Sequence, residues 1–341
     1  TKFTEEKMRL HPPSVVIFSG SSNVPLTKQI CQHLNMPLSP MYIEHFSDGE
    51  IYCRPEIHVR GKEVFIIQST DGGSDNLMEL LIMIDSLKRA SADKITVVVP
   101  YYGYSRQDRK TKSREPITAK LVANLIQIAG ATRFISVDLH AGQIQGFFDI
   151  PSDNLTAALI FRSYFMAKGI NNPIVVSPDM GGVARAKTLS KMLNCEVAIC
   201  QKNRVQKDKV DSMHLIGDVK GKTAILIDDI ISTGGTMCLA SELLMQKGAK
   251  EVYACVAHGL LVGDCIKNIN KSVFKEVVIT NSVTTKKETL QSCEKLTVLS
   301  IAPLISETIY RVCMNMSLSE VFEKTNEPTL FEDHQLPKQE I

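Results

Sequence analysis

Short apolar runs alternate with longer amphipathic segments along most of this chain. The runs are rich in Val, Ile and Leu, which is typical of buried strands. The predicted strands are Val15–Phe18, Val64–Gln68, Ile95–Val99, Phe134–Leu139, Ile174–Ser177, Glu196–Ile199, Ala224–Ile227, Glu251–Val256 and Glu276–Ile279. Between them, apolar residues recur at helical spacing, as in Leu77, Leu80, Leu81 and Ile84. Continuous apolar strands that alternate with helices predict an α/β fold, with mostly parallel sheets covered by helices on both faces.

The same plan occurs twice, about 160 residues apart. Residues 64–100 and residues 223–257 both read as strand, loop, helix, turn and strand. Upstream, a second pair of segments also matches, so that FSDGE in the first copy takes the place of QKNR in the second. Ligands of open α/β sheets bind beyond the carboxyl ends of the strands, which is where most of the motifs described below fall.

This repetition predicts two domains, at residues 14–157 and 158–325, with the end of the second packing back on the first. A length of 341 residues also suits two domains of ordinary size. Residues 1–13 are expected to form a polar extension. Beyond about Asn326 the sequence is polar and interrupted by proline, so a disordered tail is expected over residues 326–341.

The composition is that of a soluble globular protein, with 44% hydrophobic and 22% charged residues. There are 39 Lys and Arg residues against 37 Asp and Glu, which leaves +2 and no general attraction for nucleic acid or an anionic membrane. No apolar run approaches the ~20 residues of a spanning helix, and the first residues lack the apolar core of a signal peptide. Nine scattered cysteines without a CxxC pair predict reduced thiols and a cytoplasmic location.

The most informative motif is TAILIDDIISTGGT, residues 223–236. An apolar strand ends in Asp228 and Asp229, and a turn then leads into a helix. The turn consists of Ser232, Thr233, Gly234, Gly235 and Thr236. Such a turn directs several backbone N–H groups at one point and can bind a phosphate. The carboxylates cannot serve a phosphate, so we expect them to hold the hydroxyls of an attached sugar, or a metal ion.

A strand-to-helix turn with an acidic cap would have a similar composition, and α/β proteins contain many such turns. Adjacent carboxylates at a strand end, however, repel each other and lose hydration. This cost favours a binding role, and a sugar phosphate is the first ligand to suspect.

Two other strand ends carry side chains suited to a divalent metal ion. Asp138 and His140 lie two residues apart, and such residues share a face of a strand, so we predict that they project together. They can bind a nucleotide-chelated ion or form a structural hydrogen-bonded pair. Asp179 ends another predicted strand and opens a helix carrying Arg185 and Lys187, where it is either a metal ligand or a helix N-cap.

A basic run, YSRQDRKTKSR, follows the strand Ile95–Val99. Its cations are Arg106, Arg109, Lys110, Lys112 and Arg114. Most such runs are solvated surface, but this one lies at the sheet edge where a polyphosphate would need neutralising, and arginine can also lie on an adenine ring. A nuclear-localisation signal is the weaker interpretation, because Asp108 and Glu115 interrupt or border the run.

Two polar loops complete the set of motifs. In HFSDGE, Phe46 can stack on a base while Asp48 and Glu50 accept hydrogen bonds from an exocyclic amine, and a simple hairpin turn is the alternative. In QKNR, Lys202 and Arg204 can close over a transferring phosphoryl group or belong to an ordinary solvent loop.

Taken in order, these segments resemble class I ribose-phosphate diphosphokinases, which make phosphoribosyl diphosphate (PRPP), from Val15 to about Phe322. The segments closest to that family's pattern are DNLMELLIMI, SREPITAKLVANL, DLHAGQIQGFFDIPSDNL, GDVKGKTAILIDDI and EVVITNSV. The resemblance implies two tandem phosphoribosyltransferase-type (type I) domains. It implies transfer of the β,γ-diphosphoryl group of Mg²⁺-bound ATP to the C1 hydroxyl of ribose 5-phosphate, with release of AMP. It also implies a homo-oligomer built from dimers, such as a hexamer.

The resemblance assigns a role to each motif. Phe46, Asp48 and Glu50 match a loop that reaches the adenine of a neighbouring subunit, while Arg106, Gln107 and Asp108 match ATP contacts. The metal or Mg–ATP positions are matched by His140, Asp179 and Asp138. Lys202 and Arg204 match cations placed at the transition state. The ribose-5-phosphate loop is matched by Asp228, Asp229 and residues 232–236.

Ser232 is the clearest departure from the family, which usually has Asp at this position. Losing a charged acceptor for a ribose hydroxyl costs roughly 1.5–3 kcal/mol, about ten- to a hundredfold in affinity or rate. Gly142 also stands where mammalian-type members have Ser, in a region that helps to form the family's phosphate-regulated allosteric site. Phosphate activation and ADP inhibition are therefore not assumed for this chain.

Two other functions are compatible with parts of the sequence. A catalytically weak or silent regulatory subunit, assembled with an active relative, would fit Ser232. Such subunits typically lose the loop cations and the sugar-phosphate loop, whereas this chain keeps Lys202, Arg204 and the aspartate pair. A phosphoribosyltransferase that consumes PRPP would explain the sugar-phosphate turn. It would leave the repeated half of the chain and the motifs FSDGE and SRQDRK without a function. An active enzyme is therefore favoured.

Overall fold

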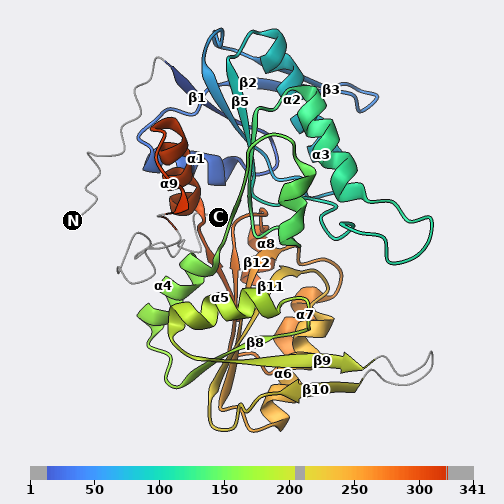
Figure 1. Cartoon of the computed structure of the whole chain (residues 1–341), viewed down its shortest axis with the longest axis vertical. Helices are drawn as coiled ribbons and strands as arrows, with labels where there is room; N and C mark the ends of the chain where they lie inside the picture. Colours follow the sequence, from blue (N-terminus) through green and yellow to red (C-terminus); the bar gives the residue numbers. More distant parts are fainter. Residues whose placement is uncertain (1–13, 204–211, 320, 322–341) are drawn as a thin grey trace. The chain divides into compact units, whose positions relative to one another are not determined.

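The computed structural model describes residues 14–203, 212–319 and 321, and the chain is drawn in Figure 1. The extension 1–13, the tail 326–341 and Arg204 lie outside these residues. Contacts group the described chain into two units. Unit 1 comprises residues 14–156 with Ser282–Thr284 and Ile301–Val321, and unit 2 comprises Ala157–Asn281 with Thr285–Ser300. Each unit is described by itself.

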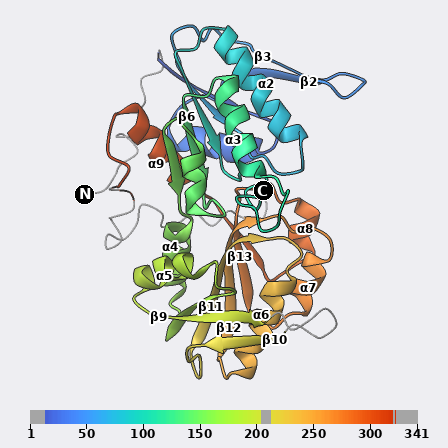
Figure 2. The same ribbon diagram turned by 45° about the vertical axis from the view of Figure 1, so that its right-hand side comes forward.

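Within its described residues, unit 1 contains a parallel sheet with the strand order β1-β4-β5-β6-β7. The strands are β1 (Val15–Ser19), β4 (Glu63–Ile67), β5 (Lys94–Val99), β6 (Arg133–Val137) and β7 (Ser152–Leu155). The helices are α1 (Val24–His33), α2 (Asp75–Arg89), α3 (Thr118–Ala129) and α9 (Ala302–Cys313), with a 3-10 helix η2 (Gly142–Phe147). Helices α2 and α3 cover one face of the sheet and α1 and α9 the other (Figures 1 and 2). Since both faces are covered, strand β1 is buried throughout, and β4 to β6 are buried except at their first residues.

An antiparallel hairpin, β2 (Met41–His45) with β3 (Ile51–Pro55), also belongs to unit 1. The N–H of Phe46 donates to the carbonyl of Glu50 (2.8 Å) across its turn. Gly49 has φ +93°, a left-handed conformation that favours glycine. HFSDGE is therefore a hairpin turn, whatever else it does. The two strands were not predicted, because they alternate exposed and more buried residues without an apolar run.

Within its described residues, unit 2 contains a sheet with the order β10-β9-β8-β11-β12-β13-β14, parallel except for β10. The strands are β8 (Pro173–Ser177), β9 (Glu196–Asn203), β10 (Ser212–Ile216), β11 (Thr223–Ile231), β12 (Glu251–Gly259), β13 (Glu276–Thr280) and β14 (Leu296–Leu299). The helices are α4 (Ala158–Lys168), α5 (Val183–Leu193), α6 (Gly235–Gln246), α7 (Cys265–Lys271) and α8 (Lys287–Gln291). Helices α4 and α5 lie on one side of this sheet and α6 and α7 on the other (Figures 1 and 2).

All nine predicted strands are present, and the α/β fold class is confirmed. The structure adds β2, β3, β7, β10 and β14. Four predicted ends were wrong by two residues or more: β6 stops at Val137, before Leu139, whereas β9 continues to Asn203, β11 to Ile231 and β12 to Gly259. Each extension includes polar or charged residues, so hydrophobicity alone could not place it inside a strand.

The predicted repeat is confirmed at the level of topology. Strands β1, β4 and β5 are adjacent in unit 1, just as β8, β11 and β12 are adjacent in unit 2. Helix α2 joins the second and third strands of the first set, and α6 joins those of the second. Each unit also contains an antiparallel pair of strands in addition to these three strands. The pair is β2 with β3 in unit 1 and β9 with β10 in unit 2.

The turn between β1 and α1 is filled by side chains of unit 1 itself. Glu79 of α2 is 1% exposed and accepts hydrogen bonds from the backbone N–H (2.6 Å) and hydroxyl (2.7 Å) of Ser21 and from Gln68 Nε2 (2.8 Å). Gln68 Oε1 accepts from the N–H and hydroxyl of Ser22. A Cβ at Gly20 would lie 2.2 Å from that oxygen. An internal carboxylate therefore takes the place that an outside anion would take at such a turn.

Two general expectations can be compared with the structure. All nine cysteines lie in the described residues, and none forms a disulfide. Among these residues, no helix is both long enough and apolar enough to cross a membrane.

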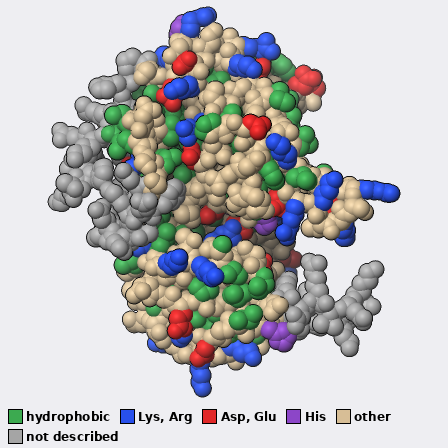
Figure 3. Space-filling model, viewed as in Figure 1, with side chains coloured by type: hydrophobic (Ala, Val, Ile, Leu, Met, Phe, Trp, Pro, Cys, Tyr) green, Lys and Arg blue, Asp and Glu red, His purple; other side chains and the backbone are tan. Residues whose placement is uncertain are grey.

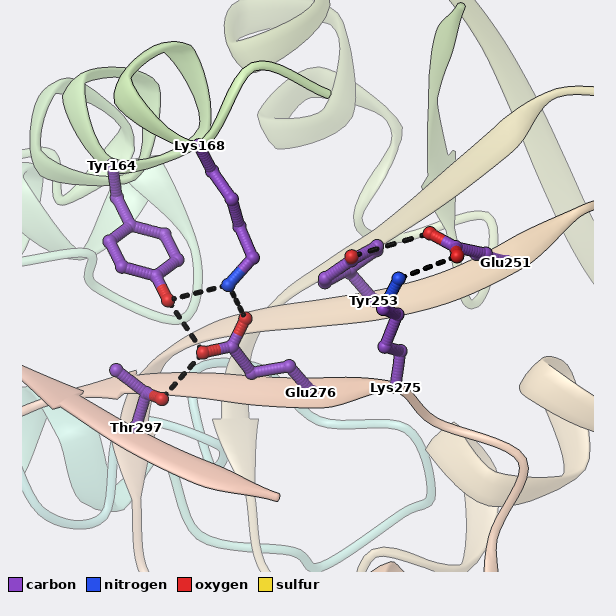
Figure 4. A network of polar contacts seen from close by, with 7 residues as sticks. All are labelled: Tyr164, Lys168, Glu251, Tyr253, Lys275, Glu276 and Thr297. Atoms are coloured by element: carbon purple, nitrogen blue, oxygen red, sulfur yellow. Dashed lines mark hydrogen bonds and ion pairs between the residues drawn. The ribbon is translucent and has the colours of Figure 1, made fainter. Parts of the chain in front are cut away.

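A polar network lies at the amino end of β13 in unit 2 (Figure 4). Glu276 accepts hydrogen bonds from Lys168 Nζ (2.6 Å), Thr297 Oγ1 (2.6 Å) and Tyr164 Oη (2.5 Å). Burial by itself raises the pKa of Glu276, but these three donors outweigh burial and lower that pKa below its ordinary value. The network therefore contributes stability only while Glu276 is ionised.

Replacing Glu276 by glutamine is expected to lower the free energy of unfolding by about 1–2 kcal/mol at pH 7, because Lys168 loses its charged partner. The folded pKa of Glu276 lies below the unfolded value of 4.5. The difference between wild type and variant should therefore be fully present above pH 4.5 and shrink as the pH falls through the folded pKa. Thermal unfolding at pH 7 and at pH 4 measures it.

Glu251 provides the matched control for this substitution, since it pairs with Lys275 at the neighbouring strand end (Figure 4). The Lys275 side chain is 53% exposed, and exposed pairs contribute little. Glu251→Gln should change the unfolding midpoint much less than Glu276→Gln. Equal losses from both substitutions would contradict the importance assigned to the more buried network.

Candidate functional site

A pocket of about 340 Å³ lies in unit 1 between the segment that follows β5 and the segment that follows β6. Its lining residues are Arg106, Gln107, Asp108, Arg109, Thr111, Glu115, Pro116 and His140. The structure thus brings three predicted ATP contacts together with one predicted metal position, although His140 is more than 30 residues away in sequence. Phe46, Asp48, Glu50 and Asp138 are not among the residues that line it.

The loop that carries the basic residues is fastened by Glu115. One oxygen of its carboxylate, Oε2, accepts hydrogen bonds from Thr111 N (2.8 Å), Thr111 Oγ1 (2.9 Å) and Lys112 N (2.9 Å). These donors lower the pKa of Glu115, with the backbone N–H of Lys112 making the largest contribution. The carboxylate therefore closes a tight turn that sets the course of the loop beside the pocket.

Other hydrogen bonds fix the base of the loop and leave its cations exposed. Gln107 is held by the N–H of Ala119, which donates to its carbonyl, and by the hydroxyl of Thr118, which donates to its side chain. Asp108 Oδ2 accepts from Gln143 Nε2 of η2 (2.8 Å). Lys and Arg side chains gather on the loop that projects at the right of Figure 3. With both carboxylates engaged by internal donors, the exposed guanidinium groups give the pocket a cationic wall suited to polyphosphate.

The prediction that Asp138 and His140 share a strand face was wrong. Strand β6 ends at Val137, and Asp138 has φ +40°, so the alternation of side chains along a strand does not extend to it. Asp138 is half-buried, and His140 is exposed at the pocket. Of the pair, His140 is the residue that accompanies the predicted ATP contacts.

The hairpin tip presents an aromatic side chain to the outside. Phe46 is 47% exposed, and its ring centroid lies 6.1 Å from that of Tyr52. Asp48 Oδ1 accepts a hydrogen bond from the N–H of Glu50 (3.1 Å), so this carboxylate also shapes the turn. The geometry leaves the aromatic face available for stacking, which is what the base-binding interpretation requires.

In unit 2 the sugar-phosphate turn lies between β11 and α6. Gly234 has φ +77° and precedes the first residue of α6 without a side chain to cap the helix. The carbonyl of Ser232 accepts from Val262 N (3.0 Å), and that of Thr233 accepts from Asn268 Nδ2 (2.9 Å). Both carbonyl oxygens thus accept hydrogen bonds from residues in α7 or just before it. The backbone N–H groups at the start of α6 carry the partial positive charge that attracts a phosphate.

The aspartate pair is not at the end of β11 but inside it, three and two residues before its last residue, Ile231. Asp229 is buried (4% exposed), and the Asp228 side chain is 21% exposed. Arg185 of α5 lies beside both, with Nη1 at 3.4 Å from Asp228 Oδ1 and 3.5 Å from Asp229 Oδ1. Burial and repulsion by Asp229 raise the pKa of Asp228 well above its ordinary value, and Arg185 opposes that rise. Only part of the pair's charge is therefore balanced within the protein.

The N-cap of α5 is Gly182, not Asp179 as the N-cap interpretation predicted, and Asp179 lies three residues before it. Asp179 Oδ1 accepts a hydrogen bond from Gly182 N (3.0 Å), and the Asp179 carbonyl accepts from Ser177 Oγ (2.6 Å). Among the described residues, no group of three or more His, Cys, Asp or Glu converges as a metal cage. Mg²⁺, however, usually takes one or two protein carboxylates and completes its shell with water and substrate phosphates. Asp179, which is exposed, and Asp138 suit such an oxygen-preferring ion better than the imidazole of His140 does.

Lys202 is the next-to-last residue of β9, and its backbone pairs with that of Met213 in β10. Its side chain, like all of Arg204, lies outside what the structure describes. The predicted roles of these two cations stay predictions.

Comparison with known proteins bears directly on these sites. A family model described as the N-terminal domain of ribose phosphate pyrophosphokinase matches residues 15–130, and one described as a phosphoribosyl synthetase-associated domain matches residues 177–323. Curated relatives named ribose-phosphate pyrophosphokinase, from Bacillus cereus and Campylobacter jejuni, are 51% and 50% identical over 307 residues. The alignments cover 90% of this chain and 96% and 98% of the two relatives. The chain belongs to the ribose-phosphate pyrophosphokinase family.

A solved structure agrees with this assignment. Phosphoribosylpyrophosphate synthetase from Mycobacterium smegmatis superposes with a TM-score of 0.83 at 40% identity, covering 89% of this chain and 99% of that one. The resemblance seen in the sequence and the tandem phosphoribosyltransferase-type fold that it implied are both confirmed.

Three residues that the sequence did not place in a site now have defined contacts there: Arg185, Glu115 and Asn268. Arg185 was noted only as part of the helix after Asp179, and Glu115 only as a border of the basic run. Each acts on a segment distant in sequence or folds a loop back on itself, so no local motif marks it. Spacing alone could have suggested Glu115, which lies four residues after the Thr111 that it binds.

Proposed function

We propose that this chain is an active ribose-phosphate diphosphokinase, which forms PRPP and AMP from ribose 5-phosphate and Mg²⁺-bound ATP. The observation that carries the proposal is about 50% identity over 90% of the chain to relatives named for this activity. The chain carries the charged residues of the motifs on which the resemblance rests, apart from Ser232.

The residues of unit 1 would bind the nucleotide. Arg106 and Arg109 line a cationic pocket, where a triphosphate can be neutralised and held by bidentate hydrogen bonds. Gln107, Asp108 and His140 lie at the same pocket. Phe46 offers an exposed ring for adenine, with Glu50 beside it, in keeping with the family's use of this loop.

The residues of unit 2 would bind the sugar phosphate. The turn from Ser232 to Thr236 presents a helix N-terminus to the 5-phosphate, and Asp228 and Asp229 would accept hydrogen bonds from ribose hydroxyls. Asp179 would supply a carboxylate to the Mg²⁺ that arrives with ATP, and this ion neutralises charge on the phosphates. Lys202 and Arg204 would add positive charge as the diphosphoryl group moves.

The transfer makes one bond and breaks one. The anomeric oxygen of ribose 5-phosphate bonds to the β-phosphorus, and the bond between that phosphorus and the bridging oxygen of AMP breaks. The hydroxyl proton passes to solvent, and AMP keeps the bridging oxygen as part of its phosphate. Positioning and charge neutralisation supply most of the rate enhancement in such reactions, which agrees with sites built from arginine, lysine and backbone N–H groups.

The deciding experiment is incubation of the purified chain with Mg²⁺, ATP and ribose 5-phosphate, followed by measurement of AMP and PRPP. Stoichiometric formation of both supports the proposal. Silence that is relieved only by an active relative would support the regulatory subunit instead. Consumption of supplied PRPP together with a nucleobase would indicate a phosphoribosyltransferase.

We also propose a cytoplasmic homo-oligomer. The reduced thiols fit that location, and in the family the adenine-binding loop serves a neighbouring subunit. Sedimentation of the same active preparation tests the assembly, and a fully active monomer would contradict it.

Replacing Ser232 by aspartate is expected to lower the KM for ribose 5-phosphate, or raise kcat, by about three- to tenfold. The substitution restores the charged acceptor usual in the family, and hydrogen bonds to charged groups are worth roughly 1.5–3 kcal/mol, part of which the hydroxyl of Ser232 already supplies. Initial rates at varied ribose 5-phosphate measure the change. Ser232→Ala serves as the control and should shift the same constants in the opposite direction. If Ser232→Asp changes neither constant, the loop is arranged differently from that of the family.

A further inference from the structure

Arg185 forms ion pairs with both members of the aspartate pair. It projects from the first turn of α5, a helix that packs against strand β11, and its side chain is 15% exposed. Both contacts are made by the same nitrogen, Nη1, at 3.4 and 3.5 Å. These distances exceed those of a tight ion pair, for which 2.7–2.9 Å is usual. The guanidinium therefore shares one nitrogen between two carboxylates instead of capping one of them.

Consecutive residues on a strand point to opposite faces, so two adjacent carboxylates normally diverge. Here the N–H of Asp229 donates to Asp228 Oδ1 (2.9 Å), which turns the Asp228 side chain back along the chain. Arg185 then holds the first oxygen of both side chains near one point. The Asp228 side chain is 21% exposed and can be reached by a ligand, whereas Asp229 is 4% exposed.

Gly182, the N-cap of α5, lies close to the end of β8 and near Arg185. A Cβ at Gly182 would lie 2.7 Å from Ser177 Oγ and 3.8 Å from both Arg185 Nη1 and Asp179 Oδ1. A side chain at residue 182 would therefore clash with Ser177, whereas the distances to the guanidinium and to the Asp179 carboxylate are those of ordinary contact. Lys187 is the nearest other cation of α5 in sequence and is exposed.

The corresponding position of unit 1 carries a neutral side chain. Gln68, directly after β4, is the counterpart of Asp228 in β11 when the two sheets are aligned on their strand register. The Gln68 amide binds Ser22 and Glu79 of its own unit. In unit 2 the same position carries a carboxylate that shares an arginine with its neighbour.

The geometry points to Arg185 as a positioning residue for ribose 5-phosphate: it acts through Asp228 and Asp229, holding the two carboxylates near one point, favouring their ionised forms and orienting them toward the ribose hydroxyls. This inference rests on the proposed function and adds to it a residue that touches neither the reacting atoms nor the phosphate. Its effect is confined to the sugar substrate. The competing role, in which the guanidinium leaves the aspartates to bind a phosphate of ATP, makes the opposite prediction for the two Michaelis constants.

The test uses the full-length chain and begins with AMP formation by the wild type, which decides the proposed function independently. Arg185→Gln is expected to raise the KM for ribose 5-phosphate about tenfold, the equivalent of one charged hydrogen bond, while the KM for ATP changes less than twofold. Arg185→Lys keeps the charge without the planar fork and should fall between wild type and Arg185→Gln. Lys191→Gln, an exposed lysine of the same helix, should leave both constants unchanged.

A double-mutant cycle with Asp228→Asn separates action through the aspartates from any other role. In the Asp228→Asn background, Arg185→Gln should change the KM for ribose 5-phosphate less than threefold, because the carboxylate that it holds is already gone. Three results would each overturn the inference. The first is that the effects of the two substitutions on the KM for ribose 5-phosphate are fully additive. The others are that Arg185→Gln alone leaves this KM unchanged, or that it raises the KM for ATP by an equal or larger factor. If Arg185→Gln fails to fold, as judged by thermal unfolding, the same cycle is run with Arg185→Lys.

Discussion

Replacing Lys202 by alanine is expected to lower kcat for PRPP formation by about two to three orders of magnitude, while the KM for ATP changes less than threefold. The family resemblance places this lysine over the diphosphoryl group as it moves, and a cation that acts on developing charge raises kcat without tightening ground-state binding. Lys202 is the next-to-last residue of β9. Initial-rate kinetics at saturating ribose 5-phosphate measure both constants.

Lys220 provides the control for this substitution, because it is an exposed lysine of the same unit at the turn before β11. Lys220→Ala should leave kcat and both Michaelis constants near the wild-type values. A rise in the KM for ATP with kcat preserved would show that Lys202 binds the nucleotide in the ground state. In that case the transition-state role assigned to the loop would be wrong.

The sequence predicted the parallel cores well because buried strands leave a continuous apolar signal. The run from Ala224 to Ile227 is an example, since helices cover both faces of β11 and every residue of the run is buried. Most of the strands that were missed lack that signal, although β14 (LTVL) has it and was missed as well. Strand β7 has the sequence SDNL, and β2 and β3 alternate exposed and more buried positions. Edge strands are stabilised by backbone pairing, which hydrophobicity does not record.

The boundaries of strands limited the prediction of the site. Asp138 was placed on a strand by simple continuation of an apolar run, but its left-handed backbone ends β6 one residue earlier. For β11 the error was reversed, because two aspartates looked like a strand end and are in fact inside the strand. Charge in a strand interior is costly, and the sequence gives no sign of the arginine on α5 that offsets it.

The contacts between distant segments were the least predictable part of both sites. Arg185 meets Asp228 and Asp229 across 43 and 44 residues of sequence, and Gln143 meets Asp108 across 35. Such contacts depend on which strands become neighbours. Once β8 is known to lie beside β11, the helix that follows β8 is bound to pack near the aspartates. Topology therefore explains these contacts after the fact, although local sequence patterns do not contain them.

Replacing Asp229 by asparagine is expected to reduce kcat/KM for ribose 5-phosphate by about ten- to a hundredfold. The substitution keeps the shape of a buried side chain but removes one charged acceptor, which corresponds to roughly 1.5–3 kcal/mol. It also removes the repulsion that helps to raise the pKa of Asp228. If ionised Asp228 is needed for sugar binding, the acid-side fall of kcat/KM should therefore move to lower pH in the variant. Initial rates between pH 5 and pH 9 measure both effects.

Asp218 is the matched control, since it is an exposed aspartate of the same unit. Its carboxylate accepts a local hydrogen bond from Lys220 N (2.9 Å). Asp218→Asn should leave both the rate and its pH dependence unaltered. The contradicting result is that Asp229→Asn lowers kcat/KM without moving the fall of kcat/KM at acid pH. That result would mean that Asp228 does not titrate between pH 5 and pH 9. The coupling between two adjacent carboxylates and one shared arginine, on which the sugar site depends, would then have to be abandoned.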